Sequence, residues 1–262
     1  MARARSVDKS LIKSWETRSK WIFLCCLFVA LGSYFYKDRL PSPDFYDAYF
    51  LEAPLQTETS TTPFTAKVNK QQYYIEPRFD YDLTGVVVSY HDADVLWDIW
   101  HHGKWQDFIN LRDLCVIWGS NVQTGVYLDM EFSNDSWTCW AYWPDRATGE
   151  RFSPSELSNN HLLADKPLVK QALMSAEPGD HIRLKGVLAS YRNPVNNFFR
   201  DTSTVRTDTG NGACETIYVK QFEILKKANP RIRALYGIAK WLCLLSFSAF
   251  CVLFAITPPT KQ

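Results

Sequence analysis

One stretch of the chain gathers most of the side chains that could hold a metal ion. His91, Asp92 and Asp94 are followed within a dozen residues by the adjacent pair His101 and His102. Imidazole and carboxylate groups together can bind a divalent ion and activate a water molecule for hydrolysis. No HExxH-like spacing sets the ligand geometry here, and a solvated insertion with its charged groups in water accounts for the same residues. We therefore expect no metal, with His91, Asp94, His101 and His102 as the ligands should one bind.

A long polar loop, residues 192–213, offers a second set of candidate binding groups. Arg200, Arg206 and Asp208 lie in it among several asparagine, serine and threonine side chains. Their donors and acceptors could serve a carbohydrate or the backbone of a partner protein, and hydrogen bonds within the loop explain the same composition equally well. Asp208-Thr-Gly also matches the tripeptide of aspartic proteases, but a polar turn that lacks a preceding apolar strand is the better explanation.

Tryptophan is used heavily between residues 97 and 143, where seven of the ten in the chain occur. The alternation of strand side chains predicts that Trp118 is a core residue, whereas Trp97 and Trp100 are candidates for a stacking or protein-contact surface. The sequence shows no recognisable Ser-His-Asp or Cys-His arrangement and no phosphate-binding loop. A binding function without a cofactor is therefore favoured over an enzymatic one.

The seven cysteines divide into two groups by their surroundings. Cysteines within apolar runs behave as small hydrophobic residues, and these are Cys25, Cys26, Cys243 and Cys251. The other three, Cys115, Cys139 and Cys214, form no CxxC pair and no zinc-finger spacing, so a structural zinc ion is not expected. If the middle of the chain faces an oxidising compartment, we expect a disulfide between Cys139 and Cys214; three buried free thiols are the alternative.

Both ends of the chain carry an apolar segment next to a basic one. Residues 1–20 form a basic leader, and residues 21–36 contain no charge and are edged by aromatic side chains, as in a membrane anchor. This run is slightly shorter than the ~20 residues of a usual span, so a cleaved signal peptide is the alternative. Residues 226–233 are again basic, and they lead into a second predicted span over residues 234–256 that only Lys240 interrupts.

The charges of the chain are segregated. Residues 78–225 contain 20 acidic and 13 basic side chains, a net charge of −7, whereas the rest contains 8 acidic and 16 basic ones, a net charge of +8. A nucleic-acid-binding domain places its positive charge where it meets phosphate, so nucleic acid is not an expected partner. The basic leader predicts that both termini, including the tail at 257–262, are cytoplasmic and that residues 78–225 lie on the outer, periplasmic side of the inner membrane.

Between the two spans the sequence predicts a stalk and a mainly β domain. Residues 37–77 contain five prolines and a threonine-rich cluster without sustained periodicity, which is typical of an extended stalk or of a loosely packed arm whose aromatic residues lie against the domain or a partner. Alternating or β-branched apolar residues bounded by turn signals predict strands, and apolar residues at helical spacing predict a helix. The predicted elements are strands at 81–90, 114–119 and 215–225, a hairpin at 125–143, a helix at 166–176 and a strand at 178–191.

Two of these strands have a glycine at their centre, at which each is expected to bend. The first contains Leu83-Thr-Gly-Val-Val-Val, and the strand after the helix begins Pro178-Gly-Asp-His-Ile-Arg-Leu-Lys-Gly. Three strands, a helix and two strands with these features resemble the oligonucleotide/oligosaccharide-binding (OB) fold superfamily over residues 78–225. The resemblance implies a five-stranded Greek-key barrel with one helix between strands three and four. It also implies that the loop at residues 192–213 lines the binding face.

The resemblance and the two spans together lead to one functional hypothesis and two alternatives. We expect a non-enzymatic, membrane-anchored OB-like module that serves as an assembly or scaffold domain of an envelope membrane complex. Its partners would be other membrane or envelope proteins, or a second copy of the chain. The first alternative is a carbohydrate-binding or metal-dependent hydrolytic domain on the outer side of the membrane. The second is single-stranded nucleic-acid binding on the cytoplasmic side, which requires the inverted topology.

Overall fold

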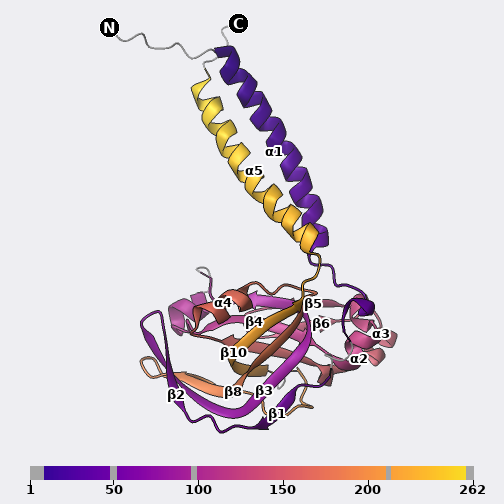
Figure 1. The fold of residues 1–262 in the computed structure, drawn as a ribbon, viewed down its shortest axis with the longest axis vertical. Coiled ribbons are helices and arrows are strands. Elements are labelled where there is room, and N and C mark those ends of the chain that lie inside the picture. Colours follow the sequence, from indigo (N-terminus) through magenta and orange to yellow (C-terminus); the bar gives the residue numbers. More distant parts are fainter. Residues whose placement is uncertain (1–8, 48–51, 96–98, 211–213, 258–262) are drawn as a thin grey trace. The chain divides into compact units, whose positions relative to one another are not determined.

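The computed structural model describes residues 9–47, 52–95, 99–210 and 214–257 (Figure 1). The chain divides into two compact units. We call the first the helical unit; it comprises Met1–Arg39 and Asn229–Gln262. We call the second the sheet unit; it comprises Leu40–Ala228.

The helical unit consists of two long antiparallel helices, α1 (Lys9–Lys37) and α5 (Pro230–Ile256). Phe23 packs against Phe247 with ring centroids 5.2 Å apart, and Tyr34 packs against Tyr236 at 6.0 Å. Both helices are long and apolar enough to cross a membrane, and little of either apolar segment is buried within the protein. Apolar helices left this exposed are costly in water, which favours a lipid surrounding.

Both helices begin earlier than the predicted spans at 21–36 and 234–256. The first extends back to Lys9, so the basic residues of the leader continue the same helix as the apolar run. Lysine and arginine are good helix formers, and they lengthen a helix without adding to its apolar face. The second starts at Pro230, which suits the first position of a helix because its missing N–H would have no partner there.

The sheet unit contains an eight-stranded sheet and a separate two-stranded one, where the sequence predicts a five-stranded barrel. The number is larger because residues 37–77 and the loop at 192–213 also contribute strands. The strands of the large sheet are β1 (Leu55–Glu58), β2 (Phe64–Val68), β3 (Gln71–Asp92), β4 (Asn110–Ile117), β7 (Leu157–Leu163), β8 (His181–Asn193), β9 (Phe198–Arg200) and β10 (Cys214–Lys226). The small sheet is the hairpin of β5 (Glu131–Asn134) and β6 (Cys139–Tyr142). The helices of this unit are η1 (Pro43–Phe45), η3 (Ile99–Lys104), α2 (Gly119–Gln123), η4 (Val126–Asp129), α3 (Arg146–Arg151), η5 (Pro154–Glu156) and α4 (Pro167–Met174).

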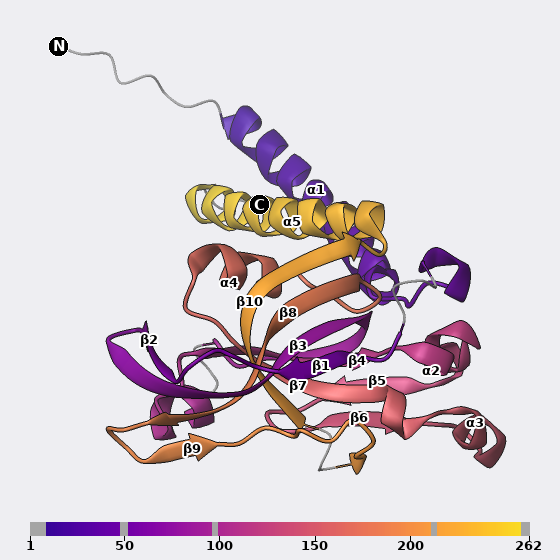
Figure 2. The same cartoon turned by 60° about the horizontal axis from the view of Figure 1, so that its bottom comes forward.

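Five strands of the large sheet pair in an order that returns to its start. β3 pairs with β4, β4 with β7, β7 with β10, β10 with β8, and β8 again with β3. Only the pairing of β7 with β10 is parallel. Figure 2 shows β8 and β10 side by side as long curved ribbons, and α4, which connects β7 to β8, contacts β10. The helix predicted at 166–176 is confirmed as α4.

Both glycine-centred strands make close backbone approaches at their glycines. A Cβ at Gly85 would lie 2.7 Å from the carbonyl oxygen of Ile117, and one at Gly186 would overlap the carbonyl oxygen of Tyr218. The register of β10 against β8 shifts directly after Val219, the partner of Gly186. A strand without a side chain at this point can curve closely around its neighbour, as the sequence predicts.

A buried arginine fastens α4 to the sheet. Arg112 of β4 forms an ion pair with Asp92, and its guanidinium lies 4.3 Å from the ring of Tyr90. It also donates hydrogen bonds to the carbonyl oxygens of Leu173 and Ala176 at the C-terminal end of α4. The carbonyl of Leu173 also accepts a hydrogen bond from the N–H of Ala176, so the guanidinium adds a further donor where the helix ends.

The structure differs from the sequence prediction in three features of the architecture. Residues 40–77 belong to the sheet unit and supply β1, β2 and the start of β3, in place of a stalk. The hairpin at 125–143 forms its own sheet, and β7 takes the place expected for the third strand. The chain as a whole mixes helix and strand because α1 and α5 alone contribute 29 and 27 residues.

The predicted disulfide between Cys139 and Cys214 is wrong. Cys139 of β6 is bonded to Cys115 of β4, with the two Cα atoms 5.7 Å apart, and Cys214 is a free thiol. Cys115 and Cys214 are both register partners of Asn159, so all three lie on one face of neighbouring strands. The hairpin covers that face and brings Cys139 above Cys115, which spacing along the chain could not reveal.

We expect this disulfide to be the link that stabilises the β5–β6 hairpin. Replacing Cys139 by serine removes a bridge between residues 24 apart and should lower the free energy of unfolding by about 2–4 kcal/mol. Denaturant titration of the full-length chain in detergent measures this, with Cys214→Ser as the matched control that should leave stability within about 1 kcal/mol. Recovery of a peptide joining residues 139 and 214 from the wild type would contradict the assignment.

A methyl group at the bend of β8 should disrupt the pairing with β10. In Gly186→Ala the new Cβ meets the rigid backbone of Tyr218, and we expect a loss of about 1–3 kcal/mol in unfolding free energy. Gly103→Ala is the control, since nothing lies within 4 Å of a Cβ there. Thermal unfolding followed by tryptophan fluorescence compares the two, and equal midpoints would show that the bend tolerates a side chain.

Candidate functional site

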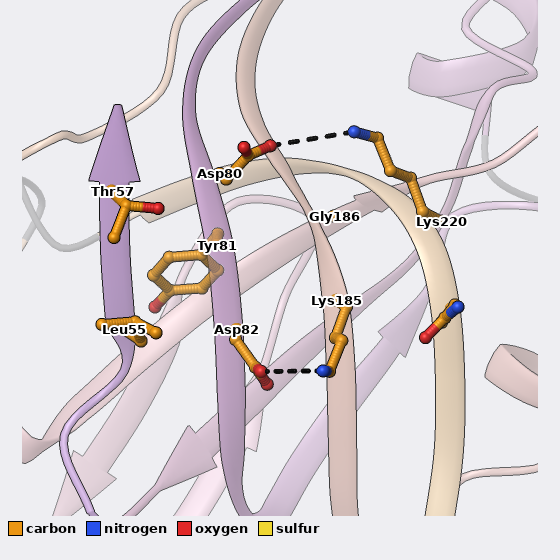
Figure 3. Close-up of a pocket in the computed structure, with 9 residues that line it drawn as sticks. Leu55, Thr57, Asp80, Tyr81, Asp82, Lys185, Gly186 and Lys220 are labelled. Carbon is orange, nitrogen blue, oxygen red and sulfur yellow. Dashed lines mark ion pairs between the residues drawn. The ribbon is translucent and has the colours of Figure 1, made fainter. Parts of the chain in front are cut away.

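An open groove of about 410 Å³ crosses the sheet over β1, β3, β8 and β10 (Figure 3). Its charged groups face one another across the strands. Asp80 lies 3.7 Å from the ammonium of Lys220, and Asp82 lies 3.3 Å from that of Lys185. Arg183 also donates two hydrogen bonds to Asp82 and holds the pKa of that carboxyl below its usual value. Because its carboxylates are already paired, the groove has little charge left to offer a ligand.

A second surface combines aromatic rings with an arginine, and we call it the aryl–arginine cluster: Trp105, Trp137, Phe198 and Arg200. The guanidinium of Arg200 lies 5.2 Å from the ring centre of Trp137, whose side chain is 44% exposed. Trp105 meets Trp137 edge to face at 4.5 Å and stacks on Phe198 at 5.6 Å. Three segments far apart in the sequence therefore present one continuous aromatic surface.

The short strand β9 positions two members of the cluster. Its pairing with β8 sets Arg200 opposite Tyr191 and Phe198 opposite Asn193. Side chains two residues apart in a strand point to the same face, so Phe198 and Arg200 lie on the face that carries Tyr191.

The turn of the β5–β6 hairpin positions Trp137. The carboxylate of Asp135 accepts hydrogen bonds from the backbone N–H groups of Trp137 and Thr138. Asn159 of β7 donates from its side chain to the carbonyl oxygen of Trp137, and its own amide oxygen accepts from Asn134. The hairpin turn is thus tied to the large sheet directly beneath the indole ring.

Trp105 lies in a loop that is held in a strained conformation. Gln106 has a positive φ of 52°, which is uncommon for a residue other than glycine. The hydroxyl of Tyr73 donates to the carbonyl of Gln106 and accepts from the N–H of Phe108 at 2.9 Å, so it clamps both sides of the strained residue. Asn196 donates to the carbonyl of Trp105 and joins this loop to the one that follows β8. Strain kept in place by several contacts is typical of functional sites.

Behind the aromatic surface lie two buried pairs of polar side chains. The hydroxyl of Tyr191 donates to Asp107 at 2.6 Å, and the two residues are fully buried or nearly so. Burial raises the pKa of Asp107 to about 6, against the opposing effects of the Tyr191 hydrogen bond and the positive charge of Arg200. The carboxyl therefore changes charge close to neutral pH.

The second pair joins β4 and β7. Nδ1 of His161 lies 2.8 Å from the carboxylate of Asp113, and Asn110 donates to the same carboxylate at 3.3 Å. Burial lowers the pKa of His161, so the neutral imidazole is favoured despite the neighbouring carboxylate. The charge of Arg200 acts on this histidine as well as on Asp107, which places the two pairs in one electrostatic environment.

The chemistry open to the cluster is recognition. The guanidinium of Arg200 makes no hydrogen bond or ion pair with any residue that the structure describes, so its planar donors remain available to a carboxylate, a carbonyl or a hydroxyl group. A guanidinium on the face of an exposed indole, beside a further indole and a phenyl ring, is a common arrangement at protein interfaces.

Of the predicted loop residues, Arg206 and Asp208 hold the loop in place. Arg206 forms an ion pair with the buried Glu215 at 2.8 Å and donates to the hydroxyl of Tyr81 at 3.1 Å. Burial raises the pKa of Glu215 to about 7, although the arginine opposes this. Asp208 accepts a hydrogen bond from Ser203 within the loop. Only Arg200 of the three reaches the aryl–arginine cluster.

The other predicted site residues do not join this cluster. Trp97 and the side chains of Trp100 and His101 lie outside the described part of the chain. Nε2 of His102 is 3.5 Å from Asp94, whose carboxylate also pairs with the ammonium of Lys170. No group of three or more possible metal ligands occurs among the described residues.

Sequence reasoning missed most of the residues that surround Arg200. Asp107 and His161 gave no signal because their partners, Tyr191 and Asp113, are brought to them by strand pairing. The polar run Ser-Asn-Asn-His in β7 gave no strand signal, although all four of these residues are buried. Trp137 was visible only as one of many tryptophans.

No protein-family model matches the chain, and searches of curated proteins and of solved structures also find no match.

The buried Asp107 should make stability depend on pH. Its pKa of about 6 in the folded chain lies above the usual value of 3.8, so the folded state binds this proton more tightly than the unfolded chain does. Protonation of Asp107 therefore stabilises the fold at low pH, and this stabilisation is lost as the pH rises through 6. Between pH 5 and pH 8 this amounts to roughly 1 kcal/mol. Denaturant titrations of the full-length chain at several pH values give the slope of unfolding free energy against pH, and Asp107→Asn should remove the contribution of Asp107 to that slope.

The matched control for this experiment is Asp82→Asn. Asp82 has a lowered pKa, so it stays ionised throughout pH 5–8 and its replacement should leave the slope unchanged. Glu215 titrates near pH 7 in every variant, so the comparison between slopes isolates Asp107. Identical slopes for the wild type and Asp107→Asn would show that Asp107 stays ionised in the folded protein.

Proposed function

We propose that this protein is a non-enzymatic, membrane-anchored assembly module whose aryl–arginine cluster binds a partner protein of the same envelope complex. The observation that carries the proposal is Arg200, which lies over the exposed ring of Trp137 with no hydrogen-bonding partner among the described residues. Tryptophan and arginine are the residue types that contribute most binding energy at protein interfaces, and here the two are stacked at one place.

The strand pairing supports an OB-type barrel as the scaffold. The cycle β3–β4–β7–β10–β8, with α4 between the third and fourth strands in sequence, has the order expected of that fold. OB folds bind their ligands on strands two and three and on the loops after strands one and four. Those parts correspond to β4, β7 and the connections at 93–109 and 194–213. The first connection contains Trp105, and the second contains Arg200.

Two features support placement of the sheet unit outside the cytoplasm. The disulfide between Cys115 and Cys139 is of a kind that persists in oxidising compartments. The leader at residues 1–20 is rich in lysine and arginine, which favours a cytoplasmic N-terminus. With α1 and α5 as two spans, we infer that the C-terminus is also cytoplasmic and that the domain lies on the periplasmic side of the inner membrane.

The surface around the cluster favours a protein as the ligand. Large apolar side chains are exposed on and just after the β5–β6 hairpin and on the loops beside β9, and these are Trp137, Trp140, Tyr142, Trp143, Val195 and Val205. Exposed apolar groups gathered on one region mark contact sites. Residues 78–225 carry a net charge of −7, which opposes phosphate backbones and suits a partner with a basic surface.

A carbohydrate is the second candidate ligand. A sugar ring stacks on an exposed indole such as that of Trp137, and the donors of Arg200 can bind its hydroxyl groups. The proposed test below therefore includes an oligosaccharide arm.

Truncation of the cluster should release the partner. A tagged full-length chain, solubilised from its native membrane in mild detergent, should retain its partners, and Trp137→Ala or Arg200→Gln should reduce the retained amount by about tenfold or more. Quantitative mass spectrometry of the purified material measures this.

Arg192→Gln is the matched control for Arg200→Gln. Arg192 also stacks on an aromatic ring, that of Tyr74 at 4.9 Å, but it is paired with Phe199 on the other face of the β8–β9 ribbon. Retention of partners by both cluster variants at the level of Arg192→Gln would refute the proposed surface. Loss of oligosaccharide binding in the same two variants, with no protein retained by the wild type, would favour the carbohydrate candidate.

A further inference from the structure

The helical unit contains a groove that runs between its two helices. The groove has a volume of about 300 Å³. Its lining residues are Leu27, Ala30, Leu31 and Tyr34 of α1 and Tyr236, Lys240, Cys243 and Leu244 of α5. Almost all of this lining is apolar, so the groove suits a hydrocarbon chain better than a polar ligand.

Lys240 gives this apolar groove one positive charge. It lies ten residues after the start of α5 at Pro230, about 15 Å along the helix axis at ~1.5 Å per residue, and therefore within the apolar segment. A charged side chain at such a position is expensive unless it reaches an interface or a partner, and it marks a functional site by default. Among the residues that the structure describes, its ammonium makes no hydrogen bond or ion pair.

The ammonium of Lys240 points toward the same end of the helix pair as other basic groups. Side chains in a helix tilt toward its N-terminus, and Lys240 Nζ lies 5.8 Å from the ring centre of Tyr236, one turn earlier. Lys37 Nζ lies 5.6 Å from that ring and 5.4 Å from the ring of Tyr34. Two ammonium groups therefore share Tyr236 at the mouth of the groove.

We infer that this groove binds an anionic phospholipid, with an acyl chain between α1 and α5 and the phosphate beside Lys240. One lipid molecule satisfies both parts of the site, because its acyl chain suits the apolar walls and its phosphate carries a negative charge for the ammonium. Asp38 already pairs with Lys37, so that ammonium is partly compensated and Lys240 is the group that selects the headgroup. The inference rests on the membrane anchorage in the proposed function.

Native mass spectrometry of the full-length chain with added phosphatidylglycerol or phosphatidylcholine of identical acyl chains tests the inference. Wild type should retain phosphatidylglycerol about fivefold better, as ~1 kcal/mol for one basic side chain predicts. Lys240→Gln should bring the two lipids to parity, and Lys240→Arg should restore the preference. Arg231→Gln, at the exposed first turn of α5, removes the same charge outside the groove and should behave as wild type.

Each arm of this experiment has a result that overturns the inference. Equal retention of the two lipids by the wild type, or an unchanged preference in Lys240→Gln, would refute the lipid site. Flotation of the same protein with liposomes measures membrane association separately from headgroup preference. A chain that floats but shows no headgroup preference leaves the proposed function intact and refutes only the lipid site, whereas a chain that does not float refutes the anchorage as well.

Discussion

The pairing of β3 with four other strands is the constraint on which the sheet unit depends. This strand runs for 22 residues and meets β1, β2, β4 and β8 along its length. A strand with so many partners has to bend, and the register shifts near Pro77 and near Val87 take up the curvature. Its inward side chains, among them Tyr73, Tyr81 and Val87, contribute to separate parts of the core. The same strand thus lines the charged groove and, through Tyr73, holds the loop that carries Trp105.

The candidate site uses this rigid sheet to hold groups that are costly by themselves. Three features of the site oppose folding: the buried carboxyl of Asp107, the buried neutral imidazole of His161 and the left-handed backbone conformation of Gln106. Contacts from β3, β4, β7 or β8 hold each of them in place. Tyr73 and Tyr191 are the clearest examples, because their rings fill the core while their hydroxyls hold Gln106 and Asp107. Such an arrangement fixes the indole and guanidinium groups in place, and groups fixed in this way lose less entropy in a binding event.

The two units differ in how they bury their apolar residues. The sheet unit buries its apolar residues against one another, and the helical unit leaves most of its own exposed. Exposed apolar helices gain their stability from lipid, and positive charges beside them add attraction to anionic headgroups. Residues 78–225 carry a negative net charge and the rest of the chain a positive one, so the positive charge lies mainly beside the apolar helices.

Local patterns in the sequence determined the elements that need no distant partner. The apolar terminal helices, α4 and the two glycine-centred strands could all be predicted, because hydrophobic periodicity and turn residues act over a few positions. Tertiary structure alone decided the partner of Cys139, the place of β7 in the sheet and the meeting of Arg200 with Trp137. Those features depend on which strands pair and in which register, and pairing is settled by the burial of the whole core rather than by neighbouring residues.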